Sequence, residues 1–153
     1  MENSRFKFRS WNTLVKKFTY FDNPEFQIGT DEFDNGLIFP LSENSKLYMG
    51  KYSELQQCTG LKDKNGKLIY EGDILELYVS SKKLYRYEVK YEIGSFMLVS
   101  QDEIFDFPNV WNDNVYPLSQ LYYEYQNEEN YIDECEIIGN IYENLELLEE
   151  HNG

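Results

Sequence analysis

The sequence predicts a mainly β protein, and three observations carry that prediction. The 153 residues include no alanine, so the best helix-forming residue is missing. They include 14 Tyr and 10 Phe, which favour strands. Short runs of alternating apolar and polar residues are separated by Gly, Asn and Ser turns. We therefore expect an N-terminal β-hairpin followed by a small SH3-like barrel or a curled antiparallel sheet, with one or two short helices near the C-terminus.

The first predicted element is the N-terminal hairpin. Residues 5–9 alternate strictly between basic and aromatic side chains, and residues 14–20 form a second strand candidate. The short break at residues 11–13 is suited to the reversal between them. Residues 22–35 are acidic and polar and contain Pro and Gly, which predicts a loop or an irregular arm.

The remaining strand candidates are short and evenly punctuated by turns, which is typical of a small barrel or curled sheet. They are residues 36–41, 46–49, 67–70, 73–79, 85–91, 95–99 and 136–142. Within the last of these, Gly139 is expected to mark a bulge or a close backbone approach.

Helical signal is confined to the C-terminal part of the chain. After Pro117, apolar residues recur at helical spacing at Leu118, Leu121, Tyr122 and Tyr125. A final turn of helix is expected after residue 144, with Asn144 as its N-cap.

The charges are distributed unevenly along the chain. Of 14 basic and 28 acidic residues, every basic one lies at or before Lys90, so residues 1–90 carry +1 and residues 91–153 carry −15. Free nucleic acid is therefore a poor partner. The basic N-terminal segment could pair with the acidic half of its own chain or with that of a neighbour, and the second alternative leaves a homo-oligomer open.

Three segments carry a resemblance to a known family. Residues 58–74, from Cys58 to Ile74, resemble the signature of the YopX proteins of phages and prophages. Residues 5–11 resemble the start of that family. Residues 137–144 resemble its closing motif. A Pro usually follows that motif, and this chain has Leu145 at that position.

The resemblance implies a single YopX-like domain over residues 1–153. Its sub-parts would be residues 1–57, with the hairpin and irregular arm, and residues 58–153, with the barrel-like part. It also implies a phage- or prophage-derived protein of unknown activity in the bacterial host cytoplasm. That location agrees with the sequence, because no apolar run approaches the about 18 residues of a membrane span, and we expect neither membrane insertion nor secretion by the general route.

The signature itself is interpreted as structural, because Gly, Asn and Asp form tight turns and tolerate positive φ. The residues of this turn motif are Gly60, Asp63, Asn65, Gly66, Gly72 and Asp73. A phosphate loop does not fit, because five residues lie between Gly60 and Gly66, whereas a phosphate loop has four between its two glycines. An EF-hand does not fit either, because Gly72 stands where a calcium-binding Glu belongs.

The sequence offers little for catalysis. His151 is the only histidine, and Cys58 and Cys135 are expected to be reduced, buried thiols. Acidic clusters could hold Mg²⁺ or act as acid and base, but 28 acids produce such clusters by density alone. The clusters are Glu71 with Asp73, Asp102 with Glu103 and Asp106, and Glu134 with Glu136. We expect no enzyme, no catalytic residue, no metal site and no cofactor.

A candidate partner-binding surface remains, where acids and aromatic rings coincide without a basic residue. Its residues are Asp102, Glu103, Asp106, Trp111, Tyr122, Tyr123 and Tyr125. These rings could equally belong to the core. We expect a non-enzymatic protein that binds a host or phage protein. The alternatives are an acidic mimic of nucleic acid that inhibits a DNA-handling host enzyme, and a carboxylate enzyme that uses Mg²⁺.

Overall fold

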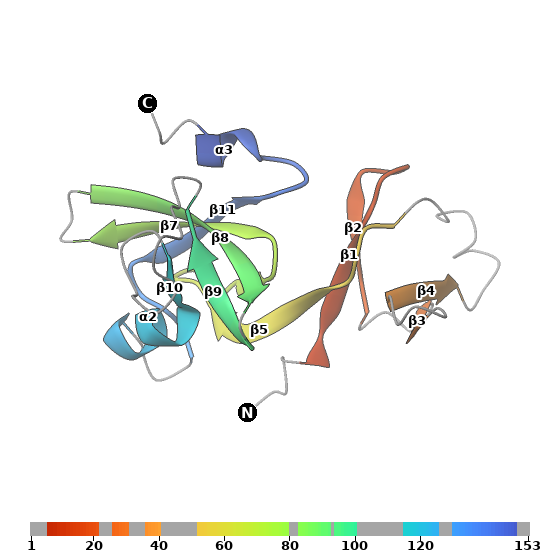
Figure 1. The fold of residues 1–153 in the computed structure, drawn as a ribbon, viewed down its shortest axis with the longest axis horizontal. Helices are drawn as coiled ribbons and strands as arrows, with labels where there is room; N and C mark the ends of the chain where they lie inside the picture. The colour runs from red at the N-terminus through yellow and green to blue at the C-terminus, as the bar shows by residue number, and fades with distance from the viewer. Residues whose placement is uncertain are drawn as a thin grey trace. The chain divides into compact units, whose positions relative to one another are not determined.

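The computed structural model shows a mainly β chain with two short helices in the part that it describes (Figure 1). The described residues are 6–21, 26–30, 36–40, 52–79, 83–92, 94–100, 115–125 and 130–149. The chain divides into two compact units, Met1–Cys58 and Thr59–Gly153. Neither helix is long and apolar enough to cross a membrane.

The first unit contains the predicted N-terminal hairpin. Strands β1 (Phe8–Asn12) and β2 (Lys17–Tyr20) pair antiparallel. The first residues of β5 (Gln56–Lys62) pair with the other side of β1, so β1 lies in the middle of this sheet. A second hairpin joins β3 (Phe26–Thr30) to β4 (Gly36–Pro40).

The turn of the first hairpin lies later than the sequence suggested. Residues 11–13 do not form the reversal, because Trp11 is a buried strand residue that pairs with Phe18. Their rings meet edge to face with centroids 5.0 Å apart, which is a favourable cross-strand aromatic contact. The chain instead reverses over residues 13–16.

The prediction of a loop over residues 22–35 is wrong for residues 26–30. Phe26, Ile28 and Thr30 have strand propensity and occupy alternate positions in β3, which pairs with β4. Residues 22–25 and 31–35 lie outside the described residues, as does the predicted strand at 46–49.

The second unit is built on a curled antiparallel sheet, one of the two forms expected. Its strand order is β10-β9-β8-β7-β11. The strands are β7 (Asp73–Val79), β8 (Lys83–Glu92), β9 (Ser95–Val99), β10 (Val115–Pro117) and β11 (Cys135–Asn140). β6 (Leu68–Tyr70) precedes β7 and neighbours β5. The strands predicted from 67–70 to 95–99 are confirmed, whereas β10 was not predicted.

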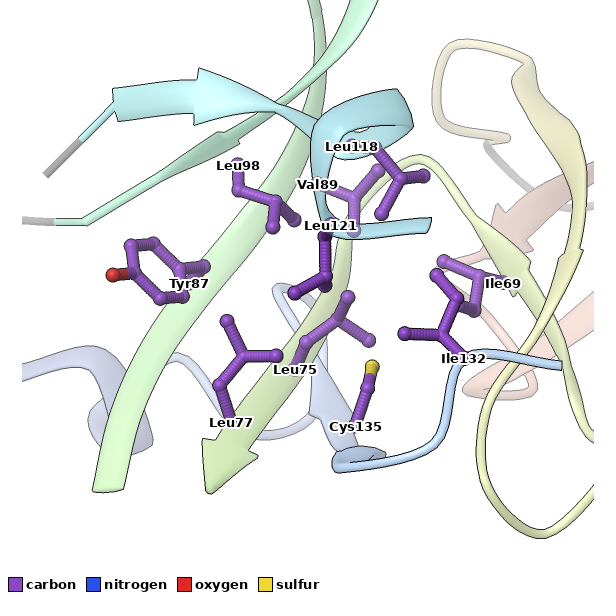
Figure 2. Packing of buried hydrophobic residues seen from close by; sticks show 10 residues of the cluster. All are labelled: Ile69, Leu75, Leu77, Tyr87, Val89, Leu98, Leu118, Leu121, Ile132 and Cys135. Atoms are coloured by element: carbon purple, nitrogen blue, oxygen red, sulfur yellow. The ribbon is translucent and has the colours of Figure 1, made fainter. Parts of the chain in front are cut away.

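Helix α2 (Leu118–Tyr125) confirms the predicted helix and covers one face of this sheet. The helix contributes the buried side chains of Leu118 and Leu121 to the core (Figure 2). Most of the other core residues lie at alternate positions of the strands. The other members of the core are Ile69, Leu75, Leu77, Tyr87, Val89, Leu98, Ile132 and Cys135. Because alternate strand residues face opposite sides, Met97 and Val99 form a separate buried cluster with Val115.

The C-terminal segment confirms one expectation and corrects another. The register of β11 against β7 shifts between Ile137 and Gly139, and a Cβ on Gly139 would lie 2.5 Å from the Asn144 Oδ1, so Gly139 marks both a bulge and a close approach. Helix α3 (Glu146–Glu149) is the expected final turn. Asn144 does not act as its side-chain N-cap, because its Oδ1 accepts a hydrogen bond from the backbone N–H of Asn140.

Candidate functional site

The buried carboxylate of Asp63 organises the turn of the signature segment. Its Oδ1 accepts hydrogen bonds from the backbone N–H groups of Asn65 and Lys67, each at 2.9 Å. Its Oδ2 accepts a third from the N–H of Ile137 in β11, at 3.0 Å. Burial of a carboxylate is costly unless it is hydrogen-bonded, and these three bonds satisfy it. Asp63 therefore holds the turn closed and ties it to β11.

The glycines of the signature take the backbone conformation that was expected. Gly60, Gly66 and Gly72 have φ of 84°, 81° and 79°, in the left-handed region that favours glycine. Gly66 also lies against the ring of Tyr131, where an added Cβ would approach Tyr131 Cε1 to 2.8 Å. Both φ and the contact with Tyr131 therefore disfavour a side chain at this position.

We expect Gly66→Ala to destabilise the protein by roughly 2–3 kcal/mol, because it adds displacement of Tyr131 to the cost of positive φ. The matched control is Gly94→Ala, since Gly94 has φ of 72° but nothing within 4 Å of its Cβ position. The control should cost only about 1 kcal/mol. Urea unfolding of both variants measures the difference, and equal losses would contradict the role given to the Tyr131 contact.

A second tight turn brings the signature against the closing motif of the chain. Asp73 is buried, and its Oδ2 accepts a hydrogen bond from the N–H of Tyr70 at 2.8 Å. The N–H of Gly72 donates to the carbonyl of Val89 at 2.8 Å, and its own carbonyl accepts from Ile141 at 2.9 Å. Residues 58–74 and 137–144, although far apart in sequence, therefore meet along one seam.

A polar cluster beside this seam joins residues that the sequence did not bring together. The Lys64 Nζ lies 3.2 Å from Glu136 Oε2, and the Arg86 Nε donates to Glu76 Oε2 at 3.0 Å. Tyr78 bridges these two pairs, since its hydroxyl donates to Glu76 Oε1 at 3.1 Å and lies 3.5 Å from Glu136 Oε2. The cluster thus connects the signature turn with β11, β7 and β8.

The electrostatics of the cluster favour stability over proton transfer. The hydrogen bond from Lys64 lowers the pKa of Glu136, and the same bond raises the pKa of Lys64. The hydrogen bond to Glu76 raises the pKa of Tyr78. Each shift moves the group away from titration near neutral pH, whereas a general acid or base needs a pKa close to the working pH. The cluster is therefore suited to holding strands together.

Two of the carboxylates singled out in the sequence have structural partners. The Asp73 carboxylate of the first pair holds a turn, and Glu136 of the last pair faces Lys64. Among the described residues, no three His, Cys, Asp or Glu side chains are placed to hold a metal ion. Asp102, Glu103 and Asp106 lie outside those residues.

Both cysteines are buried and reduced, as expected. Burial is the main cause that raises the pKa of the Cys135 thiol, and the nearby carboxylates of Asp63 and Asp73 add to it. A thiol must ionise to act as a nucleophile, so Cys135 is placed for packing.

Helix α2 carries the described part of the aromatic and acidic surface. Tyr122 and Tyr125 pack against the core, and the Tyr122 hydroxyl donates to Asn130 Oδ1 at 3.2 Å. The Tyr123 side chain is 74% exposed, next to the exposed Glu124. The structure thus separates Tyr123 from the two tyrosines that belong to the fold. Trp111, like the three acids at 102–106, lies outside the described residues.

The fold and the site define a two-unit, mainly β protein whose signature residues build turns. A family model described as "YopX protein" matches residues 7–149, and the chain belongs to the YopX family. The crystal structure of yopX from Bacillus subtilis is similar in fold, with a TM-score of 0.56 at 18% sequence identity over 94% of this chain and 98% of that one. The crystal structure of EF1440 from Enterococcus faecalis is 27% identical over 93% of this chain and 96% of that one, with a TM-score of 0.45. No curated protein matches the chain.

Proposed function

We propose that this protein is a phage- or prophage-derived accessory protein that acts in the bacterial cytoplasm by binding another protein, without catalysing a reaction. The observation that carries the proposal is the position of Tyr123. The two other tyrosines of α2, Tyr122 and Tyr125, pack against the core, while Tyr123 is 74% exposed. Large aromatic side chains with a polar tip are enriched at the centres of protein interfaces.

The charge around Tyr123 indicates the chemistry of the partner. Residues 91–153 contain 15 acids and neither Lys nor Arg, so the chain segment that carries Tyr123 produces a negative field. Such a field accelerates encounter with a basic surface, and the association rate falls as salt rises. The favoured partner is a protein with an apolar pocket for a tyrosine ring, bordered by Lys and Arg.

Tyr123→Ala is expected to weaken binding at least about tenfold, because interface tyrosines often contribute more than 1 kcal/mol. The partner is first captured from the bacterial host and identified, and the affinity of the purified pair is then measured. Gln120→Ala is the matched control, since Gln120 is an exposed polar residue on the same helix and its variant should bind normally.

Charge reversal tests the rest of the surface. The triple variant Asp102→Lys, Glu103→Lys and Asp106→Lys should slow association and leave the thermal transition nearly unchanged. Unchanged binding by both this variant and Tyr123→Ala would remove the surface from consideration.

Each alternative function predicts a different result. An acidic mimic of nucleic acid is favoured by the −15 charge of residues 91–153, and it would inhibit a DNA-handling enzyme in competition with DNA. A carboxylate enzyme would show turnover that depends on Mg²⁺ and is lost in the triple variant. A homo-oligomer is favoured by the opposite charges of the two ends of the chain.

A further inference from the structure

The tip of the β1–β2 hairpin is held by hydrogen bonds to one buried residue. The side chain of Asn12 is fully buried, and its Oδ1 accepts hydrogen bonds from the N–H groups of Leu14 and Val15 at 2.9 and 3.3 Å. The N–H of Lys16 donates to the carbonyl of Asn12 at 2.8 Å. Three consecutive backbone amides of the tip are therefore held by one residue, which fixes the conformation of the loop.

The side chains on this tip are not those that a turn requires. Leu14 is 66% and Val15 37% exposed, and Lys16 and Lys17 are exposed beside them. Lys16 has φ of 55°, a conformation that Gly or Asn adopts at lower cost. Turns favour Gly, Asn and Asp, so the requirements of the turn do not explain why two apolar side chains and two cations stand here. A preorganised apolar pair flanked by cations is suited to docking, because little conformational entropy is lost on binding.

The C-terminal segment of the same protein presents the complementary chemistry. Tyr142 is 37% and Leu145 45% exposed, close in sequence to three exposed acids. These acids are Glu143, Glu146 and Glu149. The exposed side of α2 offers one tyrosine and one acid. Residues 142–149 offer three exposed acids and two partly exposed apolar side chains, so they match the charge of the tip better.

We infer that the hairpin tip of one copy, Leu14 to Lys17, docks onto residues 142–149 of a second copy. This inference rests on the proposed function, that the protein works by binding protein surfaces, but it uses different residues from the Tyr123 surface. The two surfaces differ, so the contact is heterologous and repeats head to tail into a ring or a filament. A tip of this size buries a small area, so each contact is weak and assembly depends on concentration.

Sedimentation velocity of the full chain over a range of protein concentrations tests the contact. We expect the wild-type protein to assemble at low salt, and the double variant Leu14→Ser, Val15→Ser to associate about tenfold or more weakly, which corresponds to at least ~1.4 kcal/mol. Tyr91→Ala is the matched control, because Tyr91 in β8 is 53% exposed and belongs to neither surface, so its variant should assemble like the wild type. A monomeric wild-type protein, or a double variant that assembles normally, would overturn the inference.

Charge exchange identifies the receiving surface. Lys16→Glu with Lys17→Glu in one chain, and Glu143→Lys with Glu146→Lys and Glu149→Lys in another, should each abolish self-association. Mixing the two variants should restore it, because each tip then meets a surface of opposite charge. Failure of the mixture to assemble, with both variants shown to be folded by their thermal transitions, would exclude residues 142–149. Loss of assembly in these variants with normal binding of the captured partner would leave the proposed function intact.

Discussion

Asp63→Ala is expected to destabilise the protein by about 3 kcal/mol or more. The change removes an acceptor that serves three backbone N–H groups, and buried donors left without a partner cost about 1–3 kcal/mol each unless water reaches them. It also cuts the connection between the signature turn and β11. Denaturant unfolding followed by far-ultraviolet circular dichroism measures the loss.

Two further variants make the result specific to the acceptor role of Asp63. Asp63→Asn keeps the size of the side chain but turns one acceptor oxygen into an NH₂ donor, so it should recover only part of the loss. Glu124→Ala removes an exposed carboxylate from α2 and should change stability by less than about 0.5 kcal/mol. If Asp63→Ala and Glu124→Ala were equally stable, the three hydrogen bonds would not be what closes this turn.

Leu121→Ala is expected to cost about 2–5 kcal/mol, because Leu121 is 2% exposed in the core between α2 and the sheet. Its matched partner is Tyr123→Ala on the same helix, which should cost less than about 0.5 kcal/mol because that ring is exposed. Calorimetric melting of both variants checks the prediction. A large loss in Tyr123→Ala would show that its ring belongs to the fold and would remove the support for the binding surface.

Local patterns were sufficient to predict most of the second unit. Strands β6 to β9 are segments rich in apolar and aromatic residues, and turn residues separate them, which is the pattern that predicts strands. Residues 118–125 show helical spacing, and they form α2. In these segments the local preference and the packing agree, so nothing overrides the pattern.

The first unit was harder to predict because pairing between strands decides it. The sequence predicted that Trp11 belongs to the reversal at residues 11–13. Its contact with Phe18 instead places it in β1, and the turn begins two residues later. Strand β3 has an acidic, polar sequence around it, and pairing with β4 makes it a strand. The alternation of Phe26, Ile28 and Thr30 favours a strand, but the acidic and polar residues around it favour a loop, and the pairing decides between them.

The candidate site shows the same division. The turn role of Gly66 and Gly72 follows from residue type, since positive φ selects glycine. The polar cluster could not be predicted, because Lys64, Glu76 and Glu136 come from three elements and meet only through the register of β7 and β11. On α2, helical spacing predicted that Tyr122 and Tyr125 share a side with the two leucines and that Tyr123 does not. The packing confirms that this side faces the core.

The signature turn also has a consequence for solubility. β11 is the last strand of its sheet, and an open last strand can recruit strands from other chains into aggregates. Here the Lys64 N–H donates to the Cys135 carbonyl, and the Ile137 N–H donates to Asp63, so outward-facing groups of β11 are already bonded. The turn thus shields this edge, and a chain that lost it would expose a template for intermolecular sheet growth before it lost its core.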